Sequence, residues 1–183
     1  NGDIKIASEP GRGSAVDVAV CLKRGGEGRS SENTKLKVRE RVRMSDYDFK
    51  GKRVLLAEDL PFNAEIAGEF LSEAGLAVEY AVNGEEAVKC FARSAVGYYD
   101  LIFMDIQMPV MDGYEATRKI RGLDRPDASA VPIVAMTANA FIEDVNRAFE
   151  SGMNGHIAKP IEIPGLCAEL VRHFGDMRRG GGE

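Results

Sequence analysis

The residues with the most evident chemical potential are polar side chains that each follow a short apolar run. They are Glu58 and Asp59 after VLLA at 54–57, Asp105 after LIFM at 101–104, Thr137 after PIVAM at 132–136, and Lys159 after GHIA at 155–158. Carboxylates can bind a divalent cation and accept a phosphoryl group, and a hydroxyl and an ammonium can hold the phosphoryl oxygens. This chemistry requires the side chains to converge, so the elements that carry them decide the function.

Those elements follow from the hydrophobic pattern. Apolar runs at 54–57, 77–82, 101–104, 132–136 and 155–158 alternate with five segments of helical periodicity. Strands that alternate with helices predict an α/β fold, a parallel sheet with helices on both faces. Ligands of such sheets bind beyond the carboxyl ends of the strands, at the switch point of strand order. The polar side chains follow those ends.

If the first and third of these strands are neighbours, three carboxylates meet at their ends. Two like charges about 4 Å apart repel by roughly 4 kcal/mol at an effective dielectric constant of 20, or about three pKa units. Three ionised carboxylates therefore need either a retained proton or a divalent cation among them. Oxygen ligands of this kind suit Mg²⁺. Taken alone, Glu58 and Asp59 are more often the solvated end of a strand, so the prediction depends on the whole set.

Residues from about Lys50 to about Gly175 resemble the receiver domain of two-component response regulators, especially receivers fused to hybrid histidine kinases. The resemblance rests on Glu58-Asp59, on MDIQMPVMDGYEATRKIR at 104–121, on Met136-Thr137-Ala138 and on Lys159-Pro160. It implies a flavodoxin-like, doubly wound, five-stranded parallel sheet of order 2-1-3-4-5. It also implies that Asp105 accepts a phosphoryl group from a phosphohistidine in a Mg²⁺-dependent transfer, after which the domain changes conformation to signal.

By position, the resemblance assigns the Mg²⁺ ligands to Glu58, Asp59, Asp105 and the backbone carbonyl of Gln107. It assigns phosphoryl binding to the Thr137 hydroxyl and the Lys159 ammonium, and it implies a cis peptide between Lys159 and Pro160. His156 stands where the family commonly has an aromatic switch residue, which makes it a weaker member of the phosphoryl-binding set. Leu60 stands where many such receivers have asparagine, a departure that should spare the metal site.

The rest of the chain divides by composition. Residues 1–22 are predicted to form a hairpin with its turn at 10–13, and they resemble the last two strands of a histidine-kinase ATP-binding domain. Residues 23–50 are expected to be a basic flexible linker, residues 51–176 the receiver, and residues 177–183 a disordered tail. We therefore expect an excised fragment of a hybrid histidine kinase, whose receiver is not a kinase by itself.

Charge and cysteine content exclude several functions. Residues 54–183 carry 11 Lys and Arg against 21 Asp and Glu, so nucleic acid and membrane contacts are not expected. Cys21, Cys90 and Cys167 lie far apart, which predicts reduced thiols instead of a disulfide framework or a zinc site. No apolar run approaches the roughly 20 residues that span a bilayer. A cytoplasmic location is expected, and a membrane anchor elsewhere in the parent protein is left open.

The implied partners are a phosphohistidine-bearing kinase domain, in the parent or in another protein, and a histidine phosphotransfer protein; a dimer is left open. Two alternative functions also remain. One is a Mg²⁺-dependent phosphohydrolase with an aspartyl-phosphate intermediate, which typically needs an aspartate two positions after the nucleophile, where this chain has Gln107. The other is a pseudo-receiver, a binding module that never accepts phosphate.

Overall fold

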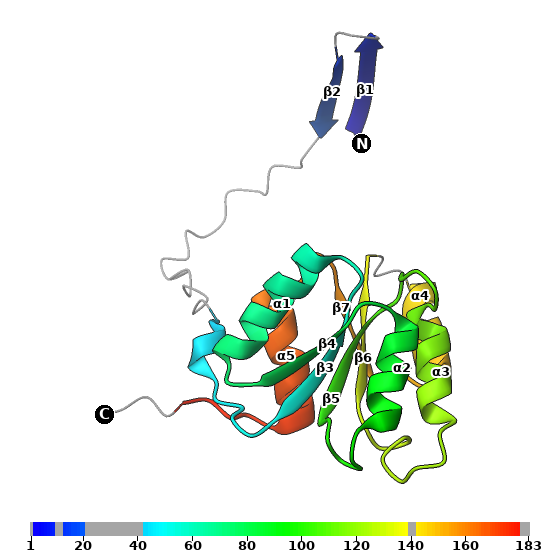
Figure 1. The fold of residues 1–183 in the computed structure, drawn as a ribbon. Coiled ribbons are helices and arrows are strands. Elements are labelled where there is room, and N and C mark those ends of the chain that lie inside the picture. The colour runs from blue at the N-terminus through cyan, green and yellow to red at the C-terminus, as the bar shows by residue number, and fades with distance from the viewer. Residues whose placement is uncertain (1, 10–12, 21–41, 139–141, 180–183) are drawn as a thin grey trace, which may run out of the picture. The chain divides into compact units, whose positions relative to one another are not determined.

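The computed structural model describes residues 2–9, 13–20, 42–138 and 142–179, which belong to two compact units, Asn1–Arg39 and Glu40–Glu183 (Figure 1). Residues 10–12 of the expected turn, residues 23–41 of the expected linker and residues 180–183 of the expected tail lie outside the described residues. In the part of the chain that is described, no helix has the length and apolar character needed to cross a bilayer.

The first unit contains the predicted hairpin. Strands β1 (Gly2–Glu9) and β2 (Gly13–Val20) pair antiparallel, with a register that runs from Gly2 opposite Val20 to Glu9 opposite Gly13. Two isolated strands are only marginally stable in water. Their assignment to an ATP-binding domain, whose other strands would cover them, stays a prediction.

The second unit is built on a five-stranded parallel sheet. Its strands are β3 (Arg53–Ala57), β4 (Ala77–Ala81), β5 (Leu101–Asp105), β6 (Ile133–Thr137) and β7 (Gly155–Ala158). In space they lie in the order β4-β3-β5-β6-β7, which is 2-1-3-4-5 along the chain and confirms the predicted fold class. Every residue of β5 and β6 is buried, as expected of central strands that are covered on both faces.

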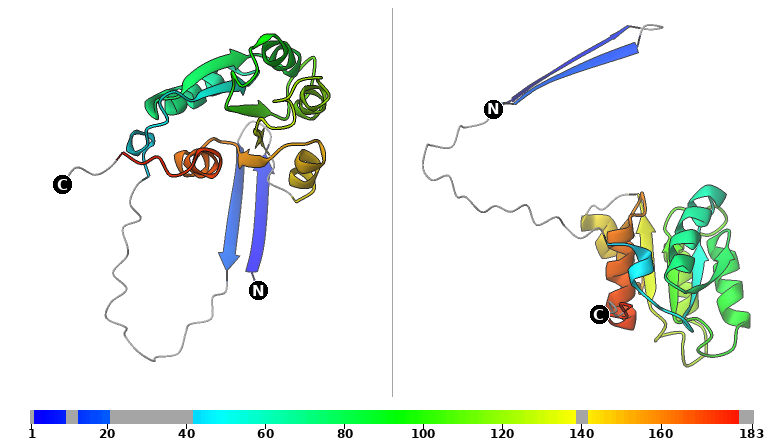
Figure 2. Two further views of the ribbon diagram at one scale, coloured as in Figure 1. Left: turned by 90° about the horizontal axis from the view of Figure 1, so that it is seen from below. Right: turned by 90° about the vertical axis from the view of Figure 1, so that its left-hand side faces the viewer.

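Five helices cover the two faces of this sheet. They are α1 (Pro61–Glu73), α2 (Gly84–Arg93), α3 (Gly113–Arg121), α4 (Ile142–Glu150) and α5 (Ile163–Phe174). Figures 1 and 2 show α1 and α5 on one face and α2, α3 and α4 on the other. A separate hydrophobic cluster fills each interface, so the ends of the central strands rest on a core that is packed from both sides.

The segment before β3 also belongs to this core. It contains a short 3-10 helix, η1 (Met44–Asp46), and it buries the side chains of Met44, Tyr47 and Phe49 in the cluster that lies under α1 and α5. The rings of Tyr47 and Phe49 stack at a centroid distance of 5.7 Å. Three large side chains buried in this way fix the segment to the sheet.

Residues 177–179 pair with the same segment. The Asp48 amide donates to the Met177 carbonyl at 2.9 Å, and the Arg179 amide donates to the Asp46 carbonyl at 2.8 Å. The sequence placed residues up to 50 in a flexible linker and residues from 177 in a disordered tail. In the structure, residues 42–50 and 177–179 instead belong to the folded unit. Residues 42–50 bury apolar side chains in the core, and residues 177–179 form hydrogen bonds with them.

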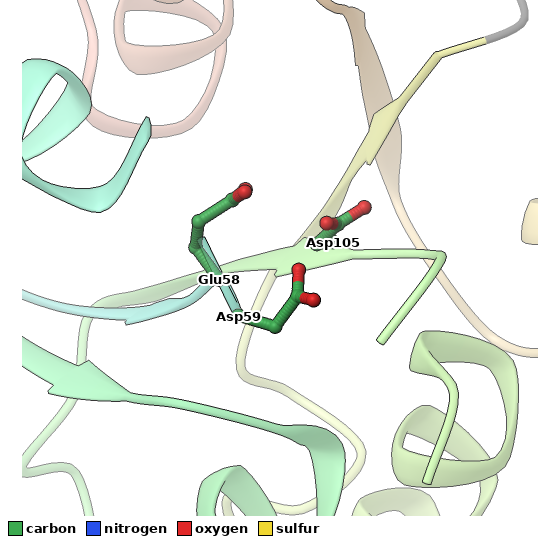
Figure 3. A group of neighbouring side chains, drawn as sticks. All are labelled: Glu58, Asp59 and Asp105. Carbon is green, nitrogen blue, oxygen red and sulfur yellow. The ribbon is translucent and has the colours of Figure 1, made fainter. Parts of the chain in front are cut away.

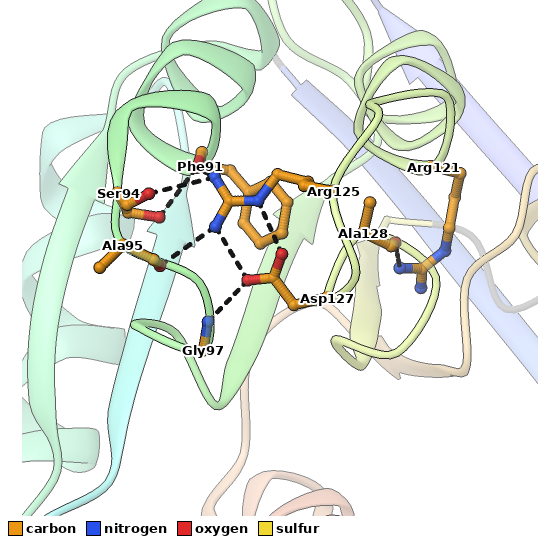
Figure 4. Close-up of polar contacts among 8 residues, drawn as sticks. All are labelled: Phe91, Ser94, Ala95, Gly97, Arg121, Arg125, Asp127 and Ala128. Atoms are coloured by element: carbon orange, nitrogen blue, oxygen red, sulfur yellow. Dashed lines mark hydrogen bonds and ion pairs between the residues drawn. The ribbon is translucent and has the colours of Figure 1, made fainter.

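The loop between α3 and β6 is anchored by Arg125 (Figure 4). Its guanidinium donates to three carbonyl oxygens at the end of α2, those of Phe91, Ser94 and Ala95. It also contacts the Asp127 carboxylate at 2.6 and 2.9 Å, and hydrogen bonding from Arg125 lowers the pKa of Asp127 to about 2. A cation at the end of a helix stabilises the unpaired carbonyls there. The loop is therefore tied to α2 at the amino end of the sheet, away from the strand tips.

Phe49→Ala tests whether the segment before β3 is part of the core. Phe49 is fully buried and lies 5.7 Å from the ring centroids of both Tyr47 and Phe174. Truncation of a buried phenylalanine should lower the free energy of unfolding by about 3–5 kcal/mol. Phe62→Ala is the matched control, because Phe62 is 71% exposed, and it should change stability by less than about 0.5 kcal/mol. Urea unfolding of the full chain measures both, and an unchanged midpoint for Phe49→Ala contradicts the packing role.

Candidate functional site

Two neighbouring strands bring the three carboxylates together. In the β3–β5 register Ala57 lies opposite Met104, so Glu58 and Asp59 follow one strand where Asp105 ends the other. Each residue offers one carboxylate oxygen within 4.8 Å of the others. Figure 3 shows the three side chains at adjacent strand ends, with the Asp59 carboxylate turned toward Asp105. Glu58 and Asp105 are 3% and 4% exposed, and Asp59 is half-buried, so the cluster opens to solvent on the Asp59 side.

Lys159 supplies the positive charge of the site. Its Nζ lies 2.6 Å from Glu58 Oε2 and 2.6 Å from Asp105 Oδ2, so one ammonium bridges carboxylates from two strands. Its backbone amide donates to the Thr137 carbonyl at 2.8 Å, and the Lys159–Pro160 peptide is cis, as the resemblance to receiver domains implied. Lys159 is thereby placed by the ends of both β6 and β7.

One ammonium does not balance three carboxylates. Burial raises the pKa of Asp105, and the hydrogen bonds from Lys159 and Gln107 offset this only in part. Burial lowers the pKa of Lys159, but the contacts with Asp105 and Glu58 outweigh it, so that the pKa of Lys159 is raised. Lys159 stays charged while ionised Asp105 is disfavoured, and more positive charge would relieve this imbalance. Three clustered oxygen donors fit a hard divalent cation such as Mg²⁺.

The remaining predicted site residues are Gln107, Thr137 and His156, and they differ in their contacts and in their exposure to solvent. The backbone amide of Gln107 donates to Asp105 Oδ1 at 3.1 Å. Thr137 ends β6 and is 7% exposed, one residue after Met136, which lies opposite Asp105 in the β5–β6 register. His156 is half-buried in β7. Because alternate strand residues face opposite ways and Ile157 packs in the cluster under α1 and α5, His156 faces the α4 side of the sheet.

The loop after β5 is held against the backbone of the site. Asp112 begins α3 as its N-cap, accepting from the Glu115 amide at 2.7 Å. A Cβ at Gly113 would overlap the carbonyl oxygen of Asp105, so only glycine allows α3 to approach so closely. Val110 has a φ of 69°, an uncommon value for a β-branched residue, and it is 79% exposed. The loop thus presents an exposed apolar side chain five residues after Asp105.

Asn63 was not predicted from the sequence. Its side-chain amide donates to Glu58 Oε1 at 2.8 Å, from the first turn of α1 back to the residue that follows β3. The only signal for this contact in the sequence is an amide side chain five residues after the first acidic residue. That spacing has no helical or strand period, because the chain changes from strand to helix between the two residues.

Known proteins with a similar sequence and fold were found by comparison. The family model of the response regulator receiver domain matches residues 54–171. The receiver domain of the sensor histidine kinase PA1611 from Pseudomonas aeruginosa PAO1, solved with a magnesium ion coordinated in its active site cleft, is 38% identical, with a TM-score of 0.61. That match covers 69% of this chain and 99% of the other.

Two further matches are a receiver domain in complex with another protein and a much longer histidine kinase. A Saccharomyces cerevisiae complex of the receiver domain of Ssk1 with the histidine phosphotransfer protein Ypd1 gives a match of 35% identity and TM-score 0.59, over 67% of this chain and 88% of that chain. Hybrid signal transduction histidine kinase B of Dictyostelium discoideum is 38% identical over an alignment of 132 residues that covers 67% of this chain. This chain spans 7% of the length of that kinase.

Asp105→Asn tests the charge imbalance through stability. The folded state raises the pKa of Asp105 above the value of about 3.9 in an unfolded chain. The free energy of unfolding therefore falls as the pH rises from the unfolded-state pKa of Asp105 through its folded-state pKa, and ionisation of Asp105 has no effect on stability well below both values. We expect Asp105→Asn to raise the urea midpoint at pH 7 in EDTA, and the gain to shrink as the pH falls toward the unfolded-state pKa.

The matched control is Asp112→Asn, since asparagine caps a helix as well as aspartate does and the midpoint should stay the same. A lower midpoint for Asp105→Asn at pH 7 would mean that ionised Asp105 stabilises the fold, contrary to the imbalance described.

Proposed function

This chain belongs to the response regulator receiver domain family, the receivers of two-component phosphorelays, and from that premise we propose that Asp105 is its phosphoacceptor. The observation that carries the proposal is the position of Asp105, whose Oδ2 lies 2.6 Å from Lys159 at a strand end that it shares with two other carboxylates. A carboxylate next to an ammonium and a cation site can approach a phosphoryl group without prohibitive repulsion.

The transfer begins from a phosphohistidine on another domain. An oxygen of Asp105 bonds to phosphorus as the bond between phosphorus and the imidazole nitrogen breaks, and the electron pair of that bond stays on the nitrogen. Such transfers depend on positioning and charge neutralisation more than on acid–base chemistry. Lys159 and the Thr137 hydroxyl then hold the phosphoryl oxygens, and His156 is the weaker member of this set.

The cation site is proposed to hold Mg²⁺. Glu58, Asp59, Asp105 and the backbone carbonyl of Gln107 would hold the ion, either directly or through its waters. Bound there, Mg²⁺ neutralises the charge that develops on the phosphoryl oxygens. The excess negative charge at the three carboxylates and the magnesium in the PA1611 receiver support this assignment.

The proposed partner is a phosphohistidine-bearing protein that docks beside Asp105. Three exposed apolar side chains lie in the segments that follow the site: Leu60, the N-cap of α1, is 54% exposed, Phe62 in the first turn of α1 is 71% exposed, and Val110 in the loop after β5 is 79% exposed. We name these three residues the apolar rim. The complex of a related receiver with Ypd1 supports a histidine phosphotransfer protein, and a kinase domain of the same parent is the other source of the phosphoryl group.

The parent protein is proposed to be a hybrid histidine kinase, in line with the Dictyostelium relative. The receiver within it accepts phosphate and does not itself use ATP. The free cysteines Cys90 and Cys167 fit the reducing cytoplasm, where we place the domain.

Incubation with phosphoramidate tests the chemistry directly. In the presence of Mg²⁺ we expect mass spectrometry to show one added phosphoryl group per chain, and none in EDTA or in Asp105→Asn. Asp112→Asn replaces the N-cap carboxylate of α3 with a carboxamide, which also caps a helix, and should be phosphorylated like the unmodified chain. Repeated turnover of phosphomonoesters would favour the phosphohydrolase, and Mg²⁺ binding without any phosphorylation would favour the pseudo-receiver.

Phe62→Ala separates docking from chemistry. Truncation of an aromatic side chain that anchors the centre of an interface costs more than about 1 kcal/mol of binding free energy, so with Phe62 in that role transfer from a phosphohistidine protein should slow by about fivefold or more. Phosphorylation by phosphoramidate should keep its rate, because no interface is involved. Phe149→Ala, which changes a 45% exposed residue of α4, is the control for loss of an exposed phenylalanine. Equal transfer rates for Phe62→Ala and Phe149→Ala contradict docking at the apolar rim.

A further inference from the structure

Asn63 is the residue through which α1 contacts the cluster of carboxylates. The helix begins at Pro61, its N-cap Leu60 provides no side-chain hydrogen bond, and its first turn carries no acidic residue. In that turn the Asn63 side chain is directed back to Glu58, with 2.8 Å between Nδ2 and Oε1. The amide therefore serves the cluster and leaves the helix start without a side-chain cap.

This contact and Lys159 together hold both oxygens of Glu58. Oε1 accepts from Asn63, and Oε2 lies 2.6 Å from Lys159 Nζ. Glu58 is 3% exposed, so solvent cannot replace a lost donor without a rearrangement. A buried acceptor that loses its partner is strongly destabilised, and a freed carboxylate would rotate or take up a proton. Asn63 thus restricts Glu58 to one orientation relative to Asp59 and Asp105.

The chemistry of the amide suits this task. A carboxamide donates a hydrogen bond and adds no charge, whereas an aspartate at the same position would add a fourth carboxylate and a lysine would compete with the cation. The same contact also bears on Lys159, which is shared between Glu58 and Asp105. With Glu58 fixed by Asn63, the ammonium is held at the distance that reaches Asp105.

We propose that Asn63 is a positioning residue for the divalent cation site, acting through Glu58; this inference rests on the proposed Mg²⁺-dependent phosphoryl transfer. Partners that orient metal ligands typically change metal affinity by 10–100-fold when they are removed. A residue that only begins the helix would behave differently. Alanine and leucine are better helix formers than asparagine, so their introduction would leave the fold intact and the Mg²⁺ affinity unchanged.

The test is calorimetric titration of the full chain with MgCl₂ for Asn63→Leu, which keeps the side-chain size, and Asn63→Ala, which removes it. We expect the dissociation constant for Mg²⁺ to rise about tenfold or more in both variants. Asn63→Gln keeps a carboxamide donor and should recover part of the affinity. Glu65→Gln, which removes an exposed charge in the same part of α1, is the control for long-range charge.

Two further measurements separate positioning from folding. In EDTA, Asn63→Leu and Asn63→Ala should lower the urea midpoint, because the buried Glu58 Oε1 loses its donor, and a single cooperative transition shows that both variants remain folded. Phosphorylation by phosphoramidate should need more Mg²⁺ for half-maximal rate in Asn63→Leu and reach a similar rate at saturation. A dissociation constant within twofold of the unmodified chain in both Asn63→Leu and Asn63→Ala overturns this inference alone. Failure of the unmodified chain to bind Mg²⁺ overturns the proposed function, and this inference with it.

Discussion

The central constraint on this domain is an excess of negative charge at the ends of two adjacent strands, β3 and β5. Glu58, Asp59 and Asp105 come within 4.8 Å of one another, and Lys159 is the cation that contacts two of them. In water such a cluster would disperse, because like charges at this spacing repel by several kcal/mol at protein-like dielectric constants. Here the acids cannot separate, because parallel pairing of β3 with β5 fixes the backbone from which they extend. The same imbalance that disfavours the resting site favours a divalent cation and an incoming phosphoryl group bound with it.

Such a site requires a rigid foundation, and the fold provides one on both faces of the sheet. The fully buried β5 and β6 lie between two hydrophobic clusters, so the strand ends cannot yield to the repulsion. The segment with Phe49 closes the cluster under α1 and α5. Arg125 fixes the loop before β6 to the end of α2, at the amino edge of the sheet. Repulsion among the carboxylates at one edge of the sheet is therefore resisted by packing and hydrogen bonds in the rest of the domain.

The strand tips could be predicted from the sequence because each polar residue ends an apolar run, and a parallel sheet gathers the ends of its strands at one edge. The core contribution of Met44, Tyr47 and Phe49 could not, since they are spaced irregularly among charged residues and show neither a helical nor a strand period. Arg125 binds carbonyl oxygens about thirty residues away, a tertiary contact without any local pattern. Asn63 was missed for a related reason: its partner lies across a change from strand to helix. Reactive side chains at strand ends can thus be predicted from the sequence. The residues that orient those side chains cannot, because their contacts depend on the geometry of the turns between elements.

Lys159 shows how this geometry can convert phosphorylation into a conformational signal. On the proposed function, phosphorylation replaces the single negative charge of Asp105 with about −1.5 to −2. Lys159 lies at the same distance, 2.6 Å, from Glu58 and from Asp105, so a closer approach to the phosphoryl group weakens its contact with Glu58. Glu58 would retain the amide of Asn63, which keeps that carboxylate in place while the ammonium moves. Because the Lys159 amide donates to the Thr137 carbonyl, the movement acts on the ends of β6 and β7 together. The resulting population shift can be no larger than the difference in the free energy of these contacts between the two states.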